Sequence, residues 1–235
     1  MAKSVEQHLI VKSNALNIAC YKLTLNEQRL VLLAIAGLNS RRPGTRPGFN
    51  QVEGIRITAG EFGEAWKLGP KDAYKALKEA TLDLYERSIT ELNGKRVSKS
   101  RWVLRVEYHD GEGWAELSFS PFVVPHLTSI GKEFTEYRLG QISGIRSTYA
   151  IRIFEWCVQF SSTGVLVVSL DELIKRLELK YKLYNDVRRF VLEPAITELQ
   201  TKSNLKISWE PIKEGRAVKS IRFTFKEDEQ GRLEL

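Results

Sequence analysis

Six residues between positions 180 and 189 have side chains or positions suited to contact with base pairs and phosphates. Arginine can bridge the O6 and N7 atoms of guanine, asparagine can bridge N6 and N7 of adenine, and the free amides at a helix start attract phosphate. On an arbitrary helix an arginine pair is more often a solvated face, so the assignment to DNA depends on the fold around it. The candidates are Lys180, Lys182, Tyr184, Asn185, Arg188 and Arg189.

Two further basic groups are candidates for contact with the DNA backbone. One surrounds a tight turn at Gly215, where Glu214 dilutes the positive charge. The other lies on a predicted helix over residues 70–87, where acidic residues alternate with lysines as on any exposed helix, so this group is the weaker candidate. The two groups are Lys213, Arg216 and Lys219, and Lys71, Lys75 and Lys78.

The charge of the chain favours a polyanionic partner. Its 36 Lys and Arg outnumber its 29 Asp and Glu, which gives a formal net charge of +7 and a pI near 9.3. Residues 176–226 alone hold twelve basic and six acidic residues, so most of the excess lies in one C-terminal stretch. A local excess points to nucleic acid more strongly than a total does.

The sequence offers no motif for catalysis or for a cofactor. It has no Gly-x-x-x-x-Gly-Lys-Ser/Thr loop, its carboxylates are scattered, and His8, His109 and His126 are isolated from one another, so we expect no enzyme activity and no metal site. Cys20 and Cys157 lack a metal-binding spacing and are expected in the core of a protein from a reducing compartment. With no membrane span or signal segment evident, the expected location is the cytoplasm, without membrane contact.

The predicted order of elements occurs twice. In the first half, helices over 58–68 and 70–87 follow a strand over 51–58 and precede strands over 88–92, 101–108 and 114–120. In the second half, a helix over 147–160 and a strand over 165–169 precede helices over 169–179 and 184–201 and strands over 205–209 and 219–225. Equivalent residues lie 111 or 115 positions apart: Thr58 and Ser169, Phe62 and Leu173, Trp66 and Leu177, Leu77 and Leu192, Ala80 and Ala195, and Leu84 and Leu199.

This order predicts an α+β chain of two tandem winged-helix domains, helix-turn-helix plus β-hairpin wing, related by internal duplication. The boundaries expected are 12–130 for the first domain, 131–146 for a linker and 147–227 for the second domain. In such a module the second short helix enters the major groove and the hairpin lies against the flanking backbone or minor groove. The C-terminal copy, with its basic recognition helix, is the expected sequence reader.

Three local features qualify this interpretation. Pro194 falls inside the second predicted recognition helix, so we expect a kink there, with Val187, Phe190, Val191 and Leu192 as core anchors. Leu16, Leu23 and Leu30 fall seven residues apart, but core packing is favoured over a coiled coil because only two heptads are present. The basic segment 41–48 is a predicted loop, either solvated or in contact with phosphate.

The chain resembles the iteron-binding plasmid replication initiators of the Rep protein family over residues 12–227. The resemblance is specific at the two ends and loose in the middle. It rests on Lys12–Leu16, Tyr21–Leu30, Arg188–Glu198 with its proline, Lys213–Arg216 and Ile221–Phe225.

The resemblance implies a protein that binds directly repeated origin DNA as a monomer and helps to open the duplex. It further implies recruitment of the host initiator, the replicative helicase and chaperones. As a dimer such a protein binds an inverted repeat and represses its own gene. By position, Lys182, Tyr184, Asn185, Arg188 and Arg189 fall on the DNA-reading helix of the family, while the N-terminal domain both touches DNA and forms the dimer interface.

Two other classes of protein remain open. A winged-helix repressor without an initiator role would share every physical feature above. A nicking initiator enzyme would need a tyrosine nucleophile beside metal-binding histidines, which the sequence does not show. The alternation of Arg101, Val103, Arg105 and Glu107 suggests a strand edge for pairing with a second chain.

Overall fold

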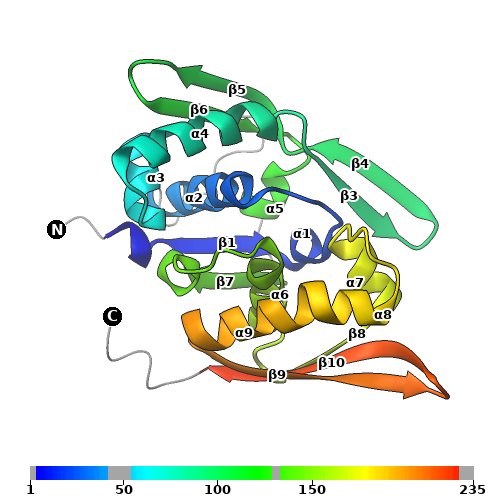
Figure 1. Cartoon of the computed structure of the whole chain (residues 1–235). Helices are drawn as coiled ribbons and strands as arrows, with labels where there is room; N and C mark the ends of the chain where they lie inside the picture. Colours follow the sequence, from blue (N-terminus) through cyan, green and yellow to red (C-terminus); the bar gives the residue numbers. More distant parts are fainter. Residues whose placement is uncertain (1–3, 42–53, 129–132, 228–235) are drawn as a thin grey trace. The chain divides into compact units, whose positions relative to one another are not determined.

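The computed structural model describes residues 4–41, 54–128 and 133–227 (Figure 1). The chain divides into two units, Met1–Gly144 and Ile145–Leu235. Within the described ranges, no helix is both long enough and apolar enough to cross a membrane. The basic segment 42–53, which includes most of the predicted loop and the start of the first predicted strand, lies outside the described residues.

The first unit is a helical core with a three-stranded sheet and two smaller strand pairs. The sheet has the order β2-β6-β5, and the pairs are β1-β7 and β3-β4, all antiparallel. The elements are η1 (Val5–Gln7), β1 (Leu9–Ser13), α1 (Asn14–Ile18), α2 (Leu25–Arg41), β2 (Ile55–Thr58), α3 (Ala59–Trp66), α4 (Pro70–Leu84), β3 (Ser88–Asn93), β4 (Arg96–Arg101), β5 (Val103–His109), β6 (Trp114–Phe119), α5 (Val124–Thr128), β7 (Phe134–Arg138) and η2 (Leu139–Ile142).

The buried helix α2 is fixed at its first turn by a capping box and an ion pair. The Thr24 amide donates to the Glu27 carboxylate at 2.8 Å, and the Glu27 amide donates to the Thr24 hydroxyl at 3.4 Å. The same carboxylate, fully buried, accepts three hydrogen bonds from the Arg87 guanidinium just beyond α4, at 3.0, 2.9 and 2.8 Å. The carboxylate therefore caps one helix and holds the end of another.

The second unit has the elements of one winged helix. Its sheet has the order β8-β10-β9, in which β9 and β10 form a long hairpin (Figure 1). The elements are α6 (Thr148–Gln159), β8 (Val165–Ser169), α7 (Leu170–Arg176), α8 (Tyr184–Val187), η3 (Arg188–Leu192), α9 (Glu193–Lys202), β9 (Leu205–Glu214) and β10 (Ala217–Glu227).

The two sheets have the same topology, which confirms the predicted repetition of the winged-helix fold. In each, the strand before the helix pair (β2, β8) is hydrogen-bonded to the last strand (β6, β10), which pairs in turn with the strand before it (β5, β9). The apolar residues matched by sequence offset are buried in both copies. The exposed fractions are 0% for Phe62 and Leu173, 2% for Trp66 and Leu177, and 0% for Leu84 and Leu199.

The prediction that residues 131–146 form a linker is wrong for most of this range. Strand β7 pairs with β1 from Leu9↔Arg138 to Ser13↔Phe134, and η2 follows it, so residues 134–142 belong to the first unit. The first unit therefore also extends below residue 12. The pairing joins segments more than 120 residues apart, and no local pattern signals such a partner.

Other differences concern the strands and the leucine spacing. The strand predicted over 101–108 is split at Trp102, which is 1% exposed, into β4 and β5, and β4 pairs with β3 as a separate hairpin. Leu16, Leu23 and Leu30 are all buried, but no continuous helix joins them, so they pack in the core and form no coiled coil. Cys20 and Cys157 are buried in the core, as predicted.

Candidate DNA interface

In the second unit, the first helix of the helix-turn-helix, α7, begins at a capping residue. The turn that follows this helix contains a residue with a strained backbone. The Ser169 hydroxyl accepts the Glu172 amide at 3.1 Å at the start of α7. Glu178, after α7, has φ +44°, and Lys67, 111 positions earlier at the end of α3, has φ +54°. Among the described residues these are the two non-glycine residues with positive φ, so the same unusual turn is kept in both copies.

The recognition helix contains a π-helical turn next to Pro194. Arg188–Leu192 form this turn, and the Glu193 amide donates to the Arg188 carbonyl, five residues back. Because proline has no N–H and its ring collides with the carbonyl four residues back, the widened turn accommodates Pro194 while Glu193 stays in the right-handed helical region. Where a kink was expected at Pro194, the structure has a π turn ahead of it, and Glu193 keeps its helical conformation.

The core side of the recognition helix differs from the prediction at one residue. Val187, Val191 and Leu192 are buried, at 0–1% exposure. Phe190, also predicted as a core anchor, is 46% exposed. In this helix Arg188, Arg189 and Phe190 form an unbroken exposed stretch between buried Val187 and Val191.

The residues predicted to read bases differ in the contacts that their side chains already make within the chain. Lys182 and Asn185 are exposed, and the side chain of neither has a hydrogen-bonding or ionic partner among the described residues. The Arg188 Nε lies 3.1 Å from the Glu193 carboxylate. Arg189 lies over the Phe190 ring at 5.3 Å, so its five N–H donors face no carboxylate of the described chain.

Two aromatic residues complete this edge. Lys180 lies over the Tyr181 ring at 5.2 Å, and the Tyr181 ring stacks on Phe190 with centroids 5.1 Å apart. Tyr184 is half-buried, and burial raises the pKa of its phenol, so the group is a neutral hydrogen-bond donor at neutral pH. Tyr181 and Phe190 were not among the predicted site residues, although Tyr181 lies between Lys180 and Lys182, and Phe190 directly follows Arg189.

A carboxylate ties the recognition helix to the start of α6. The Glu198 oxygens accept the backbone amides of Arg146 and Ser147, each at 2.9 Å, and Lys202 at 2.8 Å. Burial alone would raise the pKa of Glu198, but these hydrogen bonds together hold it below its usual range. The contact satisfies free amides at the start of α6 and fixes α9 against it.

The wing presents three basic residues near its tip. Gly215, with φ +60°, allows the turn between β9 and β10, and the side chains of Lys213 and Arg216 have no hydrogen-bonding or ionic partner among the described residues. The register shifts between Val218 and Ser220, which leaves Lys219 as the extra residue of a β-bulge. A bulge re-aims its side chain and twists the strand. Arg222, farther from the tip, is instead paired with Glu210 at 2.9 Å.

The three lysines of α4, which form the equivalent basic group of the first unit, are only partly available for contact with DNA. Lys71 is exposed without a described partner, and Lys75 lies 3.9 Å from Glu79. Lys78 donates to Asp110 at 2.8 Å, which raises the pKa of Lys78 and lowers that of Asp110. This pairing, unforeseen from the sequence, occupies one of the three predicted lysines.

The Lys78 contact is part of a clamp on the turn of the first wing. The Tyr74 hydroxyl donates to Asp110 at 2.6 Å and accepts the Gly111 amide at 3.0 Å. Helix α4 thus holds the β5–β6 turn through three hydrogen bonds. The pairing gives Lys78 a role in positioning the wing.

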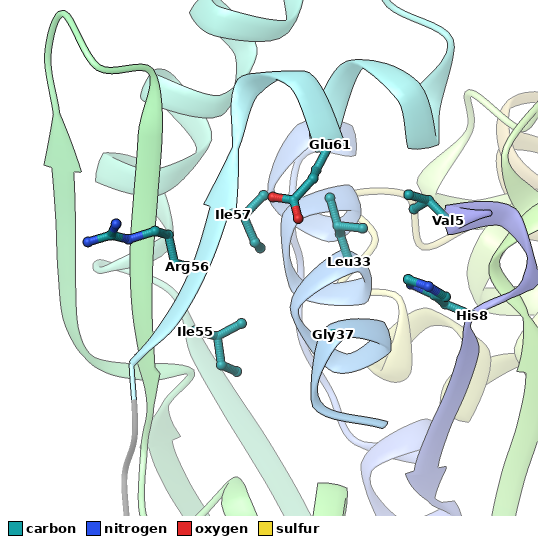
Figure 2. Close-up of a pocket in the computed structure, with 8 residues that line it drawn as sticks. All are labelled: Val5, His8, Leu33, Gly37, Ile55, Arg56, Ile57 and Glu61. Atoms are coloured by element: carbon teal, nitrogen blue, oxygen red, sulfur yellow. The ribbon is translucent and has the colours of Figure 1, made fainter. Parts of the chain in front are cut away.

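A pocket of about 110 Å³ lies in the first unit, away from the basic residues of α4. Figure 2 shows His8 and Val5 on one side of it and Ile55 and Ile57 of β2 on the other, with Arg56 directed away. Arg56 lies over the Trp114 ring at 3.6 Å. Pockets for small ligands typically measure ~300–1,000 Å³, so this one is too small for a cofactor. Within the described ranges, no cluster of His, Cys, Asp and Glu could hold a metal ion.

The two units define a tandem winged-helix protein with a helix-turn-helix and a β-hairpin wing in each half. A family model described as "Initiator Replication protein, WH1" matches residues 9–158, and one described as "Initiator Rep protein, WH2" matches residues 169–225. The chain belongs to this family of replication initiator proteins. The resemblance found in residues 12–227 is thereby confirmed.

Similar proteins agree with this membership. A "Replication initiation protein" of Escherichia coli is 26% identical over 94% of this chain and 71% of its own length. The "PI protein" of Escherichia coli is 26% identical over 92% of this chain and 82% of its own length. The fold is similar to that in the crystal structure of the Pi initiator protein in complex with iteron DNA, with a TM-score of 0.77, 22% identity, and coverage of 95% of this chain and 99% of that one.

Proposed function

We propose that this chain initiates replication of a plasmid by binding directly repeated origin DNA. The observation that carries the proposal is one exposed edge of the second unit, where Asn185 and Arg189 on the recognition helix and Lys182 just before it form no ion pair with a carboxylate of the described residues. A major-groove helix reads bases with such donors. The unpaired Lys213 and Arg216 of the wing would hold the adjacent phosphates.

The two units have different parts in this proposal. The second unit reads the repeat through Lys180, Lys182, Tyr184, Asn185, Arg188 and Arg189, with Lys213, Arg216 and Lys219 on the backbone. The first unit makes auxiliary backbone contacts through Lys71 and Lys75, with Lys78 released from Asp110 on binding. The first unit also mediates self-association, for which the free edge of β5 in the β2-β6-β5 sheet is a candidate.

Binding to the repeats would promote opening of the duplex and recruit the host initiator, replicative helicase and chaperones. A dimer bound to an inverted repeat would repress the gene of the protein. The chain would act in the cytoplasm on plasmid DNA, with no catalytic step, metal or cofactor of its own. Membership of the initiator family supports this division of roles.

The decisive experiment supplies the chain in trans to a plasmid that carries the candidate origin but no initiator gene. The proposal predicts that the plasmid is maintained with the wild-type chain and lost with an Asn185→Ala/Arg189→Ala double variant. A repressor without an initiator role would bind the same DNA but would not maintain the plasmid. Metal-dependent cleavage of origin DNA would instead indicate a nicking enzyme.

A further inference from the structure

An exposed aromatic ring lies among the charged residues of the recognition helix. Phe190 directly follows Arg188 and Arg189, is 46% exposed, and has buried Val191 as its next neighbour. Burying its ring in the core would be worth roughly 1.5–3 kcal/mol, and the π turn leaves this ring half outside. Widened turns of this kind are frequent at functional sites.

Neighbouring side chains hold the Phe190 ring in place. Tyr181 stacks on it with an interplanar angle of 17° and centroids 5.1 Å apart. The Arg189 guanidinium lies 5.3 Å from its centroid. Phe122, 73% exposed in the first unit, shows that exposure alone is unremarkable in this chain. Phe190 differs because it is both held by a second ring and placed beside a base-reading arginine.

We infer that Phe190 reads a thymine by packing against its C5-methyl group in the major groove. The inference rests on the proposed function, since it requires this helix to enter the groove. The thymine methyl is the one apolar group that base pairs present in the major groove, and apolar side chains recognise it by contact. The polar residues of the helix would read hydrogen-bonding edges, and the Tyr181–Phe190 pair would add selection for A·T pairs.

The test removes the methyl group from the DNA and the ring from the protein. Wild-type chain first selects duplexes from a random-sequence pool, and each thymine of the selected site is then replaced singly by uracil. Dissociation constants are measured for the wild type, Phe190→Ala, Phe190→His and the control Phe122→Ala. Phe190→His keeps a ring against Tyr181 but presents polar nitrogens, so it also covers the case in which the alanine variant unfolds.

At one thymine, replacement by uracil should weaken wild-type binding about fourfold, the value of one buried methyl group. Phe190→Ala and Phe190→His should lose a similar factor on thymine DNA and be indifferent to uracil at that position. Phe122→Ala should match the wild type. The inference is overturned if the wild type is insensitive to uracil everywhere, or if the Phe190 variants keep its sensitivity. If the wild type selects no sequence at all, the proposed function fails as well.

Discussion

Arg188 and Arg189 are neighbours on the recognition helix, but the structure predicts that their removal has unequal effects. A bidentate contact to guanine is worth ~1–3 kcal/mol. Arg189 has no carboxylate among its described contacts, so Arg189→Ala should lose that full amount, roughly 5- to 150-fold in affinity. Arg188 must first leave Glu193, at 3.1 Å, and an exposed pair of this kind is worth ~0.2–1 kcal/mol. Arg188→Ala should therefore weaken binding by ~0.2–1 kcal/mol less than Arg189→Ala does.

The Arg188–Glu193 pair also predicts a variant with higher affinity for DNA. Glu193→Gln releases Arg188 and removes a negative charge near the phosphates, so it should strengthen binding by the same ~0.2–1 kcal/mol. The assay is fluorescence anisotropy on a labelled repeat duplex and on an unrelated duplex, at two salt concentrations. Lys226→Ala is the charge-matched control, because Lys226 pairs in register with Lys206 at the open end of the hairpin, away from the tip.

Unchanged specific affinity in both arginine variants would refute the assignment of this helix to base reading. Equal losses for Arg188→Ala and Arg189→Ala, with no gain for Glu193→Gln, would refute the role given to the Arg188–Glu193 pair. Equal loss on the specific and the unrelated duplex would show that the arginines contact phosphate only.

Three further variants test the framework around this site. Because the folded-state pKa of Glu198 is lowered, its stabilisation is present above the unfolded value near 4.5 and is lost as the pH falls through the lower folded-state pKa. Glu198→Gln should therefore lower the melting temperature more at pH 7 than at pH 3, and equal effects at both pH values would contradict this. Asp110→Asn removes the carboxylate that Lys78 must leave before it reaches a phosphate, so the variant should bind an unrelated duplex about two- to fivefold more tightly than the wild type; unchanged affinity would mean that Lys78 does not contact DNA. Leu192→Ala removes a fully buried anchor of the recognition helix and should cost ~2–5 kcal/mol of unfolding free energy in urea, and a loss below 1 kcal/mol would contradict the packing.

The repeated fold could be predicted because its signals are local. The Thr58–Glu61 capping box is formed, with the Glu61 amide 3.1 Å from the Thr58 hydroxyl, and the Ser169 hydroxyl caps α7 in the same way. The apolar residues matched between the two copies, such as Phe62 and Leu173, are buried as expected, because helix periodicity fixes which face is apolar. The same signals place the basic residues on one helix and one hairpin.

The missed features depend on contacts that no local pattern encodes. Strand β7 was missed because its partner β1 is distant in the sequence. Phe190 was misplaced because the π turn changes the helical register that the prediction assumed. The pairing of Lys78 with Asp110 depends on the folded wing, which brings together residues 32 positions apart.

The most direct test of the account is a footprint of the wild-type chain on the DNA that flanks its own gene. The account predicts periodic protection across an array of direct repeats, and loss of that pattern in Arg189→Ala at protein concentrations that saturate the wild type. Protection of an inverted repeat alone would support a repressor without an initiator role. Uniform protection without a repeat would contradict the claim that the C-terminal winged helix reads repeated origin DNA.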